Sequence, residues 1–213
     1  MINNKYKNVY FITGLAYAGK STMAKLLSEK YNGIHCEENY QDRVLESLDK
    51  NEFPALTYTR DLVEWRDFVV RTPDEYEKWI NEASKECEIV ELMLLEDIIK
   101  DGRKVFVDTN ISLDTLRKIS DNDHVLIMLA DPEISVKRFF ERPDREKQFL
   151  YSLLLKEENP DLALDNFRKC LERINCQENY DMFFNSGFNV VLRDEDRSIE
   201  DTLKIVEEKF KLR

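Results

Sequence analysis

The sequence predicts an α/β protein built on a five-stranded parallel sheet. Five short apolar runs, rich in β-branched residues, are bounded by polar or turn residues, and helical patterns separate every successive pair. The runs are residues 9–12, 34–36, 105–107, 125–129 and 189–192. Strands that alternate with helices imply right-handed crossovers, helices on both faces of the sheet, and ligands at the carboxyl ends of the strands.

The first strand leads directly into a glycine-rich turn. Residues 14–21 read Gly-Leu-Ala-Tyr-Ala-Gly-Lys-Ser, which fits the phosphate-binding loop pattern of Gly, four free positions, Gly, Lys and then Ser or Thr. A buried-strand pattern precedes this turn and a helical pattern follows it, which is the context the motif requires. The sequence therefore predicts a nucleoside triphosphate site here, the alternative being a glycine turn with an incidental lysine.

Each position of this turn has a definite expected role. Gly14 and Gly19 let the backbone turn so that successive amide N–H groups face phosphate oxygens, and the helix from Ser21 adds its positive dipole end. Lys20 is expected to reach the β- and γ-phosphates, and the Ser21 hydroxyl to ligate magnesium. Tyr17 either packs over a ligand or lies exposed. The residues expected to contact the nucleotide are Gly14, Ala16, Ala18, Gly19, Lys20, Ser21 and Thr22.

The second strand ends at two acids, Glu37 and Glu38. Phosphoryl transfer to a hydroxyl needs a group that takes or orients the acceptor proton, and a carboxylate at this strand end can reach the γ-phosphate. Both residues are therefore candidates for the base and for acceptor binding. The alternative is that they are two solvated acids in a turn.

A long excursion, residues 40–101, separates the second and third strands. It is mostly helical, and between Asp74 and Asp101 apolar residues recur every three or four places, as in an amphipathic helix. We expect this insertion to bind the phosphoryl acceptor. Arg60, Arg66 and Arg71 of the insertion are candidates for binding an anionic acceptor, and Trp65 or Trp79 offers a flat apolar surface. The alternative is that each arginine is solvated and paired with a neighbouring Asp.

The third strand closes on Asp108, beside the expected phosphate loop. A carboxylate at this position can hold the magnesium shell or approach the acceptor. The alternative is that Asp108 caps the turn through Thr109 and Asn110. Helix starts are expected after Asp131 and Asn159, each followed by a proline, and at Ser198 with Asp201.

These residues together resemble the small-molecule and nucleoside monophosphate kinases of the P-loop group, which includes shikimate, gluconate, adenylate and nicotinamide riboside kinases. The resemblance spans nearly the whole chain and implies a three-layer α/β/α P-loop NTPase fold with strand order 2-3-1-4-5. It also implies ATP and Mg²⁺ as cofactors. Many members carry aspartates after the second strand, whereas this chain has glutamates, so the base stays open between Glu37, Glu38 and Asp108.

The resemblance also implies an arginine-bearing lid, which we place at residues 137–148. Arg138, Arg142 and Arg145 are expected to contact the triphosphate, and Arg138 and Arg142 to stabilise the charge that develops during transfer. Ordinary helical pairing with Glu141 is the alternative for these arginines. The loop after the last strand, residues 193–196, corresponds to the segment with which members often contact adenine.

Length and composition set further limits. The 213 residues fit one domain spanning 1–213, with 42% hydrophobic and 35% charged residues. The net charge of −11 argues against a nucleic-acid partner, and no apolar stretch is long enough to cross a membrane. No signal peptide fits the N-terminus, so a cytoplasmic location is expected. The four cysteines are expected to be reduced, and neither histidine is expected to bind a metal.

The expected function is an ATP-dependent phosphotransferase, a P-loop small-molecule kinase that moves the γ-phosphoryl group of ATP to a hydroxyl or phosphate of a small metabolite. The alternative is a nucleotide-binding regulatory module, or an NTPase without a small-molecule acceptor. The sequence contains no guanine-specificity, switch or transporter signature that would favour this alternative. It does not indicate the acceptor, the choice between ATP and GTP, or the oligomeric state.

Overall fold

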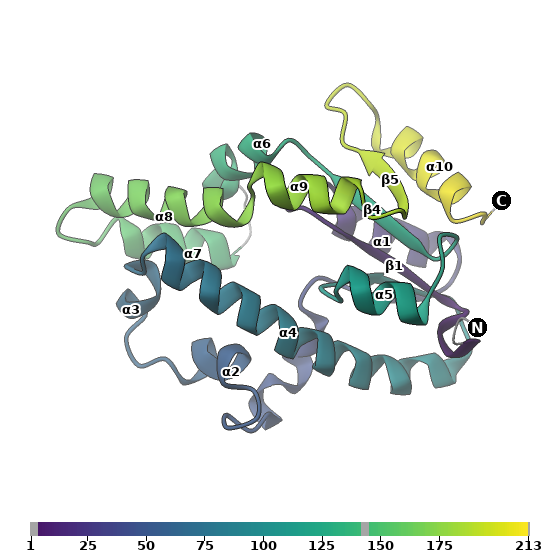
Figure 1. Ribbon diagram of the computed structural model, residues 1–213, viewed down its shortest axis with the longest axis horizontal. Coiled ribbons are helices and arrows are strands. Elements are labelled where there is room, and N and C mark those ends of the chain that lie inside the picture. The colour runs from purple at the N-terminus through teal and green to yellow at the C-terminus, as the bar shows by residue number, and fades with distance from the viewer. Residues whose placement is uncertain (1–3, 142–144, 213) are drawn as a thin grey trace.

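The computed structural model describes residues 4–141 and 145–212 and has a five-stranded, all-parallel sheet at its centre (Figure 1). The strands are β1 (Val9–Gly14), β2 (Ile34–Cys36), β3 (Val105–Asp108), β4 (Val125–Leu129) and β5 (Asn189–Leu192). Their order across the sheet is β2-β3-β1-β4-β5. All five predicted strands and their predicted order are confirmed.

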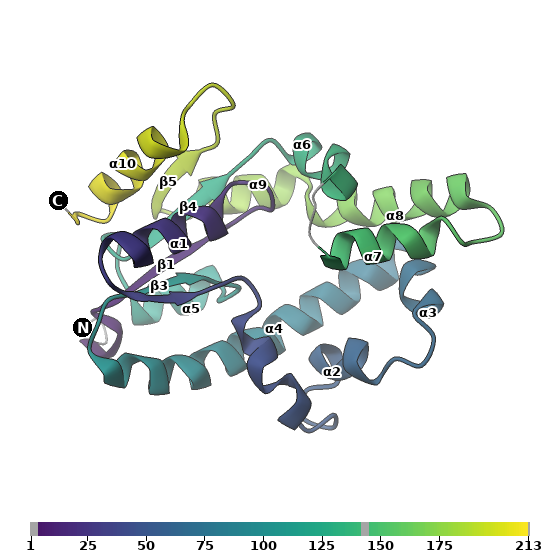
Figure 2. The same ribbon diagram turned by 180° about the vertical axis from the view of Figure 1, so that it is seen from behind.

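Helices cover both faces of the sheet, an arrangement compatible with a three-layer α/β/α fold (Figure 2). On one face lie α1 (Lys20–Lys30) and α10 (Ile199–Lys209), which bury Leu27 and Val206 against Phe106 and Leu126. On the other lie α5 (Leu113–Ile119), α9 (Gln177–Phe184) and the C-terminal half of α4 (Pro73–Ile98). Because both faces are covered, β1, β3 and β4 are almost entirely buried, and their sequences are apolar without alternation.

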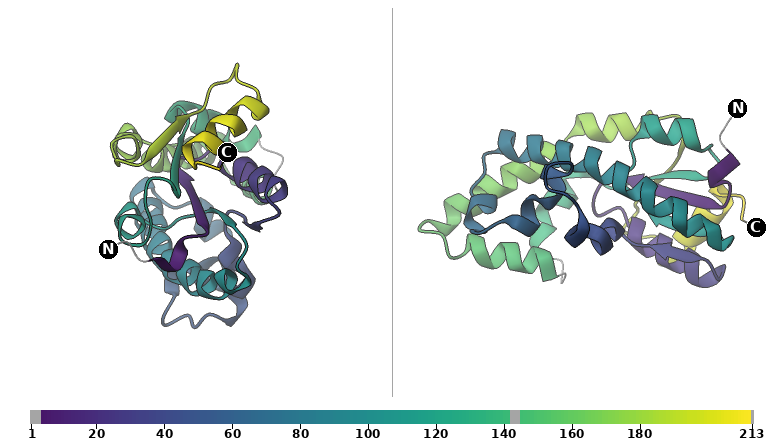
Figure 3. Two further views of the ribbon diagram at one scale, coloured as in Figure 1. Left: turned by 90° about the vertical axis from the view of Figure 1, so that its right-hand side faces the viewer. Right: turned by 90° about the horizontal axis from the view of Figure 1, so that it is seen from below.

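A helical lobe extends from the carboxyl-terminal edge of the sheet. It contains α2 (Pro54–Asp61), α3 (Arg66–Val69), the N-terminal half of α4, α6 (Pro132–Lys137), α7 (Arg145–Leu154) and α8 (Pro160–Ile174). A separate apolar cluster holds the lobe together, with Phe68, Tyr76 and Phe167 buried among its members. Figure 3 shows the resulting elongated shape, with both termini at the sheet end and α8 at the other. Short 3₁₀ segments complete the described chain: Asn4–Tyr6, Tyr40–Ser47, Ile99–Asp101 and Phe139–Glu141.

The helix starts follow the expected capping chemistry. Asp131 accepts a hydrogen bond from the amide of Glu133, Asn159 from that of Leu162, and Ser198 from that of Asp201, so all three predicted caps are confirmed. Helix α4 begins with a capping box between Thr72 and Glu75, followed by Pro73 in the first turn. This cap starts the longest helix of the fold, which runs from the lobe to the sheet.

No helix within residues 4–141 and 145–212 is both long enough and apolar enough to pass through a lipid bilayer. The same residues contain no cluster of three or more His, Cys, Asp or Glu side chains arranged to hold a metal ion. All four cysteines are free thiols, three of them buried.

Candidate functional site

The Gly14–Ser21 loop joins β1 to α1 at the carboxyl end of the central strand (Figure 2). Gly14 has a φ of +127°, and a Cβ built on it would lie 2.1 Å from the carbonyl oxygen of Met128 on β4. Gly19 has a φ of +91° and is the N-cap residue of α1. Glycine is needed at both positions because side chains rarely adopt these conformations, and at Gly14 also because the neighbouring backbone leaves no room.

The hydroxyl of Ser21 donates a hydrogen bond of 2.6 Å to Oδ2 of Asp108. Asp108 ends β3, the strand beside β1, and its side chain is almost fully buried. Burial raises the pKa of this carboxyl, while the charge of Lys20 and the Ser21 hydrogen bond oppose that rise. The loop, the first turn of α1 and the end of β3 therefore form one polar cluster in an otherwise apolar part of the sheet.

The turn after Asp108 is held by a different carboxylate, that of Glu91 on α4. Glu91 is fully buried and accepts hydrogen bonds from the hydroxyl of Thr109 at 2.5 Å and from the amide of Asn110 at 3.0 Å. Burial raises the pKa of Glu91, and these hydrogen bonds act in the opposite direction. Glu91 thus caps the turn through Thr109 and Asn110, the role that the alternative interpretation gave to Asp108. The Asp108 carboxylate is bonded to Ser21 instead.

Lys20 and the acids after β2 lie around the same strand ends. The ammonium of Lys20 donates to the carbonyl oxygen of Leu15 within the loop, at 3.2 Å. Glu37 is exposed and lies 3.8 Å from Arg43, and Glu38 is exposed and close enough to Asp108 to raise the pKa of its carboxyl. Because β2 pairs with β3, both glutamates start from the strand end adjacent to Asp108.

Tyr17 connects the loop to two other segments. Its carbonyl oxygen accepts a 2.5 Å hydrogen bond from Arg193, whose guanidinium also lies 4.4 Å from the centre of the Tyr17 ring. Arg138 lies 5.9 Å from the same ring, and its interaction with Tyr17 is the main cause of its raised pKa. Tyr17 therefore lies beside two arginines, one following β5 and one following α6.

The loop is also fixed from the side of α6. The hydroxyl of Ser135, which is buried, donates a 2.8 Å hydrogen bond to the carbonyl oxygen of Ala16. Arg138 pairs with Glu195 at 3.4 Å and lies 3.9 Å from Glu141. The predicted lid arginine at the start of 137–148 is thus beside the loop, with acidic partners on two sides.

A small cavity of about 200 Å³ adjoins the loop on the side of α10. The loop and first turn of α1 contribute Ala18, Gly19 and Thr22 to its wall, and the segment after β5 contributes Arg193 to Glu195. Arg197, on the same segment, donates to the carbonyl oxygen of Leu192 at 3.1 Å. The segment that the sequence analysis associated with adenine therefore borders a recess next to the predicted phosphate-binding turn.

The other predicted arginines are dispersed. Arg60 forms a bidentate pair with Asp61 and donates to the carbonyl oxygens of Leu45 and Leu48, so it serves mainly to hold the lobe. Arg66 pairs with Glu157 at 3.1 Å. Arg71 stacks on the rings of Tyr58, Phe68 and Trp79. These three side chains are not brought together into one anion-binding group.

The remaining lid arginines have different positions. Arg145 lies at the start of α7 and lines a second cavity, which α4 and the segment after β2 also border. Arg142 lies outside the residues that the structure describes. The structure thus places Arg138 beside the loop and Arg145 toward the helical lobe.

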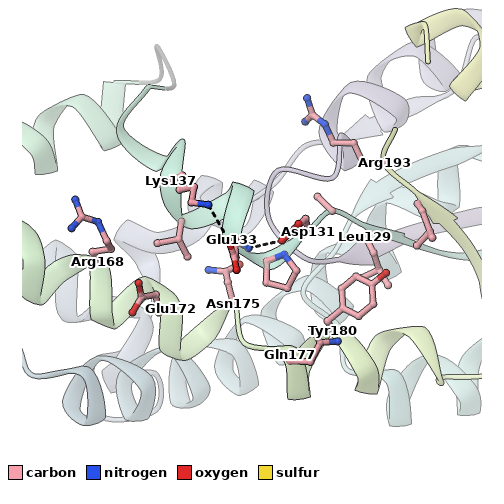
Figure 4. Close-up of a pocket in the computed structure, with 14 residues that line it drawn as sticks. Leu129, Asp131, Glu133, Lys137, Arg168, Glu172, Asn175, Gln177, Tyr180 and Arg193 are labelled. Atoms are coloured by element: carbon pink, nitrogen blue, oxygen red, sulfur yellow. Dashed lines mark hydrogen bonds and ion pairs between the residues drawn. The ribbon is translucent and has the colours of Figure 1, made fainter. Parts of the chain in front are cut away.

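A cavity of about 1180 Å³ among the described residues does not contain the Gly14–Ser21 loop (Figure 4). It lies between α6, α8 and α9, and Figure 4 shows Lys137 and Glu133 directed toward one another across α6. Their ion pair measures 2.8 Å, and Asp131 caps the same helix. Two other charged lining residues pair with neighbours, Arg168 with Asp165 and Arg193 with Glu195, and exposed pairs of this kind contribute little. The candidate site is therefore the Gly14–Ser21 loop and the strand ends around it.

Two residues of the site were not foreseen from the sequence. Glu91 occupies an apolar stripe of α4 between Cys87 and Leu95, and Ser135 lies in the first turns of α6. The only signal for Glu91 is an acid on the buried face of an amphipathic helix, which calls for a partner elsewhere in the fold. For Ser135 the sequence carries no comparable signal.

Comparison with known proteins gives no family assignment. No protein-family model matches the chain, and no curated protein is significantly similar to it.

Proposed function

We propose that the protein is a magnesium-dependent phosphotransferase that moves the γ-phosphoryl group of ATP to a hydroxyl or phosphate of a small molecule. The observation that carries this proposal is the hydrogen bond between Ser21 and the buried Asp108, formed where a glycine-rich loop enters α1. A buried carboxylate is costly to retain, and burial raises the pKa of Asp108 accordingly. The desolvation cost of Asp108 is explained if this carboxylate, Lys20 and the start of α1 together bind a metal–phosphate complex.

The loop supplies donors for phosphate oxygens. The first amides of a helix have no partner within the helix, and the first turn of α1 contains no acidic residue to compete with an anion. Lys20 adds one full positive charge at the same helix start. This combination favours the polyphosphate of a nucleotide over a single carboxylate.

Ser21 and Asp108 fit the requirements of magnesium bound together with a nucleotide. Mg²⁺ commonly takes one or two protein oxygens together with phosphate oxygens and water, so a larger cluster of protein ligands is not required. Bound in this way, magnesium would neutralise charge on the β- and γ-phosphates. Ser21 and Asp108 would hold the ion, and Glu91 would keep Asp108 in place by fixing the turn that follows it.

The remaining steps of the reaction fall to residues at the strand ends and after α6. Glu37, Glu38 or Asp108 would orient the acceptor and take its proton, since all three start from the ends of the adjacent strands β2 and β3. Lys20 and Arg138 would stabilise negative charge on the transferring group. Positioning and electrostatic stabilisation, rather than covalent catalysis, account for the rate in such a site.

The proposal is tested by replacing Lys20 with alanine and measuring MgATP binding by titration calorimetry together with the rates of ATP consumption and phosphoryl transfer. We expect binding to weaken strongly and turnover to disappear while the unfolding transition is retained. Lys25→Ala, an exposed lysine on the same helix, is the matched control and should leave both measurements unchanged. Full turnover in Lys20→Ala, or no ATP binding to the unaltered protein, would contradict the proposal.

A further inference from the structure

A second cavity, of about 610 Å³, lies between the helical lobe and the ends of β2 and β3. Asn39, one residue after Glu38, and Asn110, two residues after Asp108, both line it. Its remaining wall comes from the 3₁₀ segment Tyr40–Ser47 and from α2, α3, α4 and α7. The cavity is therefore adjacent to the carboxylates proposed to orient the acceptor, on the lobe side of the sheet, and its volume is in the range of small-molecule sites.

Five aromatic side chains form part of the wall of this cavity. They are Trp65, Phe68, Tyr76, Trp79 and Phe149. Trp65 meets Phe68 and Phe149 edge-on, with ring centres 5.9 and 5.1 Å apart, and Phe68 meets Trp79 at 5.0 Å. Trp79 is further fixed by a 3.1 Å hydrogen bond to the carbonyl oxygen of Ala55. Such a rigid set of rings suits a flat apolar ligand.

One polar atom in this wall has no partner. Gln41 is 4% exposed, and its Oε1 is buried without a hydrogen-bond partner in the described structure, while its Nε2 donates to Asn39 at 3.4 Å. Leaving a buried amide oxygen unsatisfied is unfavourable, so a ligand N–H that reached this oxygen from the cavity would supply the missing donor. Gln41 comes directly after Tyr40, whose hydroxyl is held by the backbone of α4.

The charge of the cavity disfavours an anion. Its charged lining residues, among those the structure describes, are Asp42, Glu146 and Arg145, which leave an excess of one negative charge. Arg60 and Arg66 are engaged elsewhere by Asp61 and Glu157, and neither lines the cavity. A phosphate or carboxylate group would therefore meet net repulsion here.

We infer that this cavity binds the phosphoryl acceptor, and that the acceptor is a flat, uncharged heteroaromatic alcohol with an N–H donor, the chemistry of a nucleoside. The role of this compound as acceptor rests on the proposed function, whereas its binding to the cavity is independent of that function. The ring would lie among the five aromatic side chains, its N–H would donate to Gln41, and its hydroxyl would face the ends of β2 and β3. This differs from the anionic acceptor expected from the arginines of the insertion.

The experiment uses intrinsic fluorescence, because Trp65 and Trp79 are the two tryptophans of the chain and both line the cavity. The probes are the common ribonucleosides and 2′-deoxyribonucleosides and their 5′-monophosphates. We expect at least one nucleoside to quench the fluorescence saturably, and its monophosphate to bind at least about tenfold more weakly. Failure of every nucleoside to bind, or equal or tighter binding of the monophosphates, would overturn the inference.

Variants locate the binding. Gln41→Leu should weaken nucleoside binding by roughly tenfold, because one hydrogen bond is lost, and Gln177→Leu, in the cavity of about 1180 Å³, is the matched control. If Gln41→Leu does not fold, Ser84→Phe serves instead, since this exposed position of α4 lines the cavity and a large ring there would block it. Unchanged binding in the folded variant would refute the placement.

Failure of the inference and failure of the proposed function give different results. Lys20→Ala should lose MgATP binding yet retain nucleoside quenching. Quenching by nucleosides without any ATP binding would refute the kinase proposal and retain the ligand class of the cavity. ATP binding without quenching by any nucleoside would refute the inference alone.

Discussion

Replacing Asp108 with asparagine separates the contribution of this residue to stability from its contribution to function. The substitution keeps the shape of the side chain and an oxygen that can accept from Ser21, but removes a buried negative charge. A hydrogen bond to a charged acceptor is worth about 1.5–3 kcal/mol and one to a neutral acceptor about 0.5–1.5 kcal/mol, so about 1 kcal/mol is lost. Relief of desolvation offsets this loss, and we expect the unfolding free energy to change by no more than about 1 kcal/mol.

The raised pKa of Asp108 determines how the stability difference between Asp108→Asn and the unaltered protein changes with pH. The pKa of Asp108 is raised by burial, so its folded form holds the proton more tightly than the unfolded chain does. Its contribution to stability is full below the unfolded pKa, about 3.9, and is lost as the pH rises through the folded pKa. Asp108→Asn lacks this loss, so its stability relative to the unaltered protein should increase with pH above about 4 and then level off.

Although Asp108→Asn should change stability little, it should weaken magnesium-dependent ATP binding. Loss of a carboxylate that holds or orients a metal ligand typically lowers metal affinity or activity by 10–100-fold, roughly. We therefore expect the magnesium-dependent part of ATP affinity to fall by that factor, measured by calorimetry with and without magnesium and compared with urea unfolding. Asp114→Asn, an exposed acid on α5, is the control. A loss of more than about 2 kcal/mol of stability, with unchanged magnesium dependence, would refute this account of Asp108.

Two further substitutions test the framework of the site. Gly14→Ala should destabilise the fold by at least about 2 kcal/mol in urea unfolding, because its Cβ would lie 2.1 Å from the carbonyl oxygen of Met128. Gly102→Ala is the control, since Gly102 also has a positive φ, +85°, but a Cβ there would meet no atom within 4 Å, so this variant should lose less stability. Equal losses in the two variants would contradict the steric explanation. Glu91→Ala should lower the unfolding free energy by about 2–4 kcal/mol, since it leaves the amide of Asn110 and the hydroxyl of Thr109 without their acceptor. Glu91→Gln should retain the fold and, because burial raises the pKa of Glu91, should lose less stability than the unaltered protein as the pH rises above about 4.5. A smaller loss of stability in the alanine variant than in the glutamine variant would rule this out.

The sheet was predictable because its strands are buried on both faces. Apolar runs such as Val125–Leu129 carry no alternation, and the helical stretches between them leave only parallel pairing. The loop conformation was predictable for a related reason, since Gly14 and Gly19 have positive φ values that few other residues adopt. In both cases the information is local in sequence.

The lobe and its polar contacts were less predictable because they depend on distant segments. The apolar cluster of the helical lobe joins Tyr76 of α4 to Phe167 of α8, and neither helical pattern indicates its partner. Glu91 meets Thr109 and Asn110 across 18 and 19 residues, and an acid on an apolar helix face does not show which groups it will accept from. For Arg60 the alternative given by the sequence, pairing with a neighbouring Asp, is the arrangement observed.

The arginines around the loop illustrate how an acidic chain can still present a cationic site. Arg138 and Arg193 both pair with Glu195, and their side chains are 42% and 31% exposed. Exposed pairs of this kind contribute little, at most about 1 kcal/mol, so a triphosphate can replace Glu195 as their partner at small cost. The first turn of α1 contains no acidic residue, and the carboxylate that interacts with Lys20 is that of Asp108, which we propose holds magnesium. The net charge of −11 therefore argues against a broad polyanion such as nucleic acid without arguing against a compact one held at this loop.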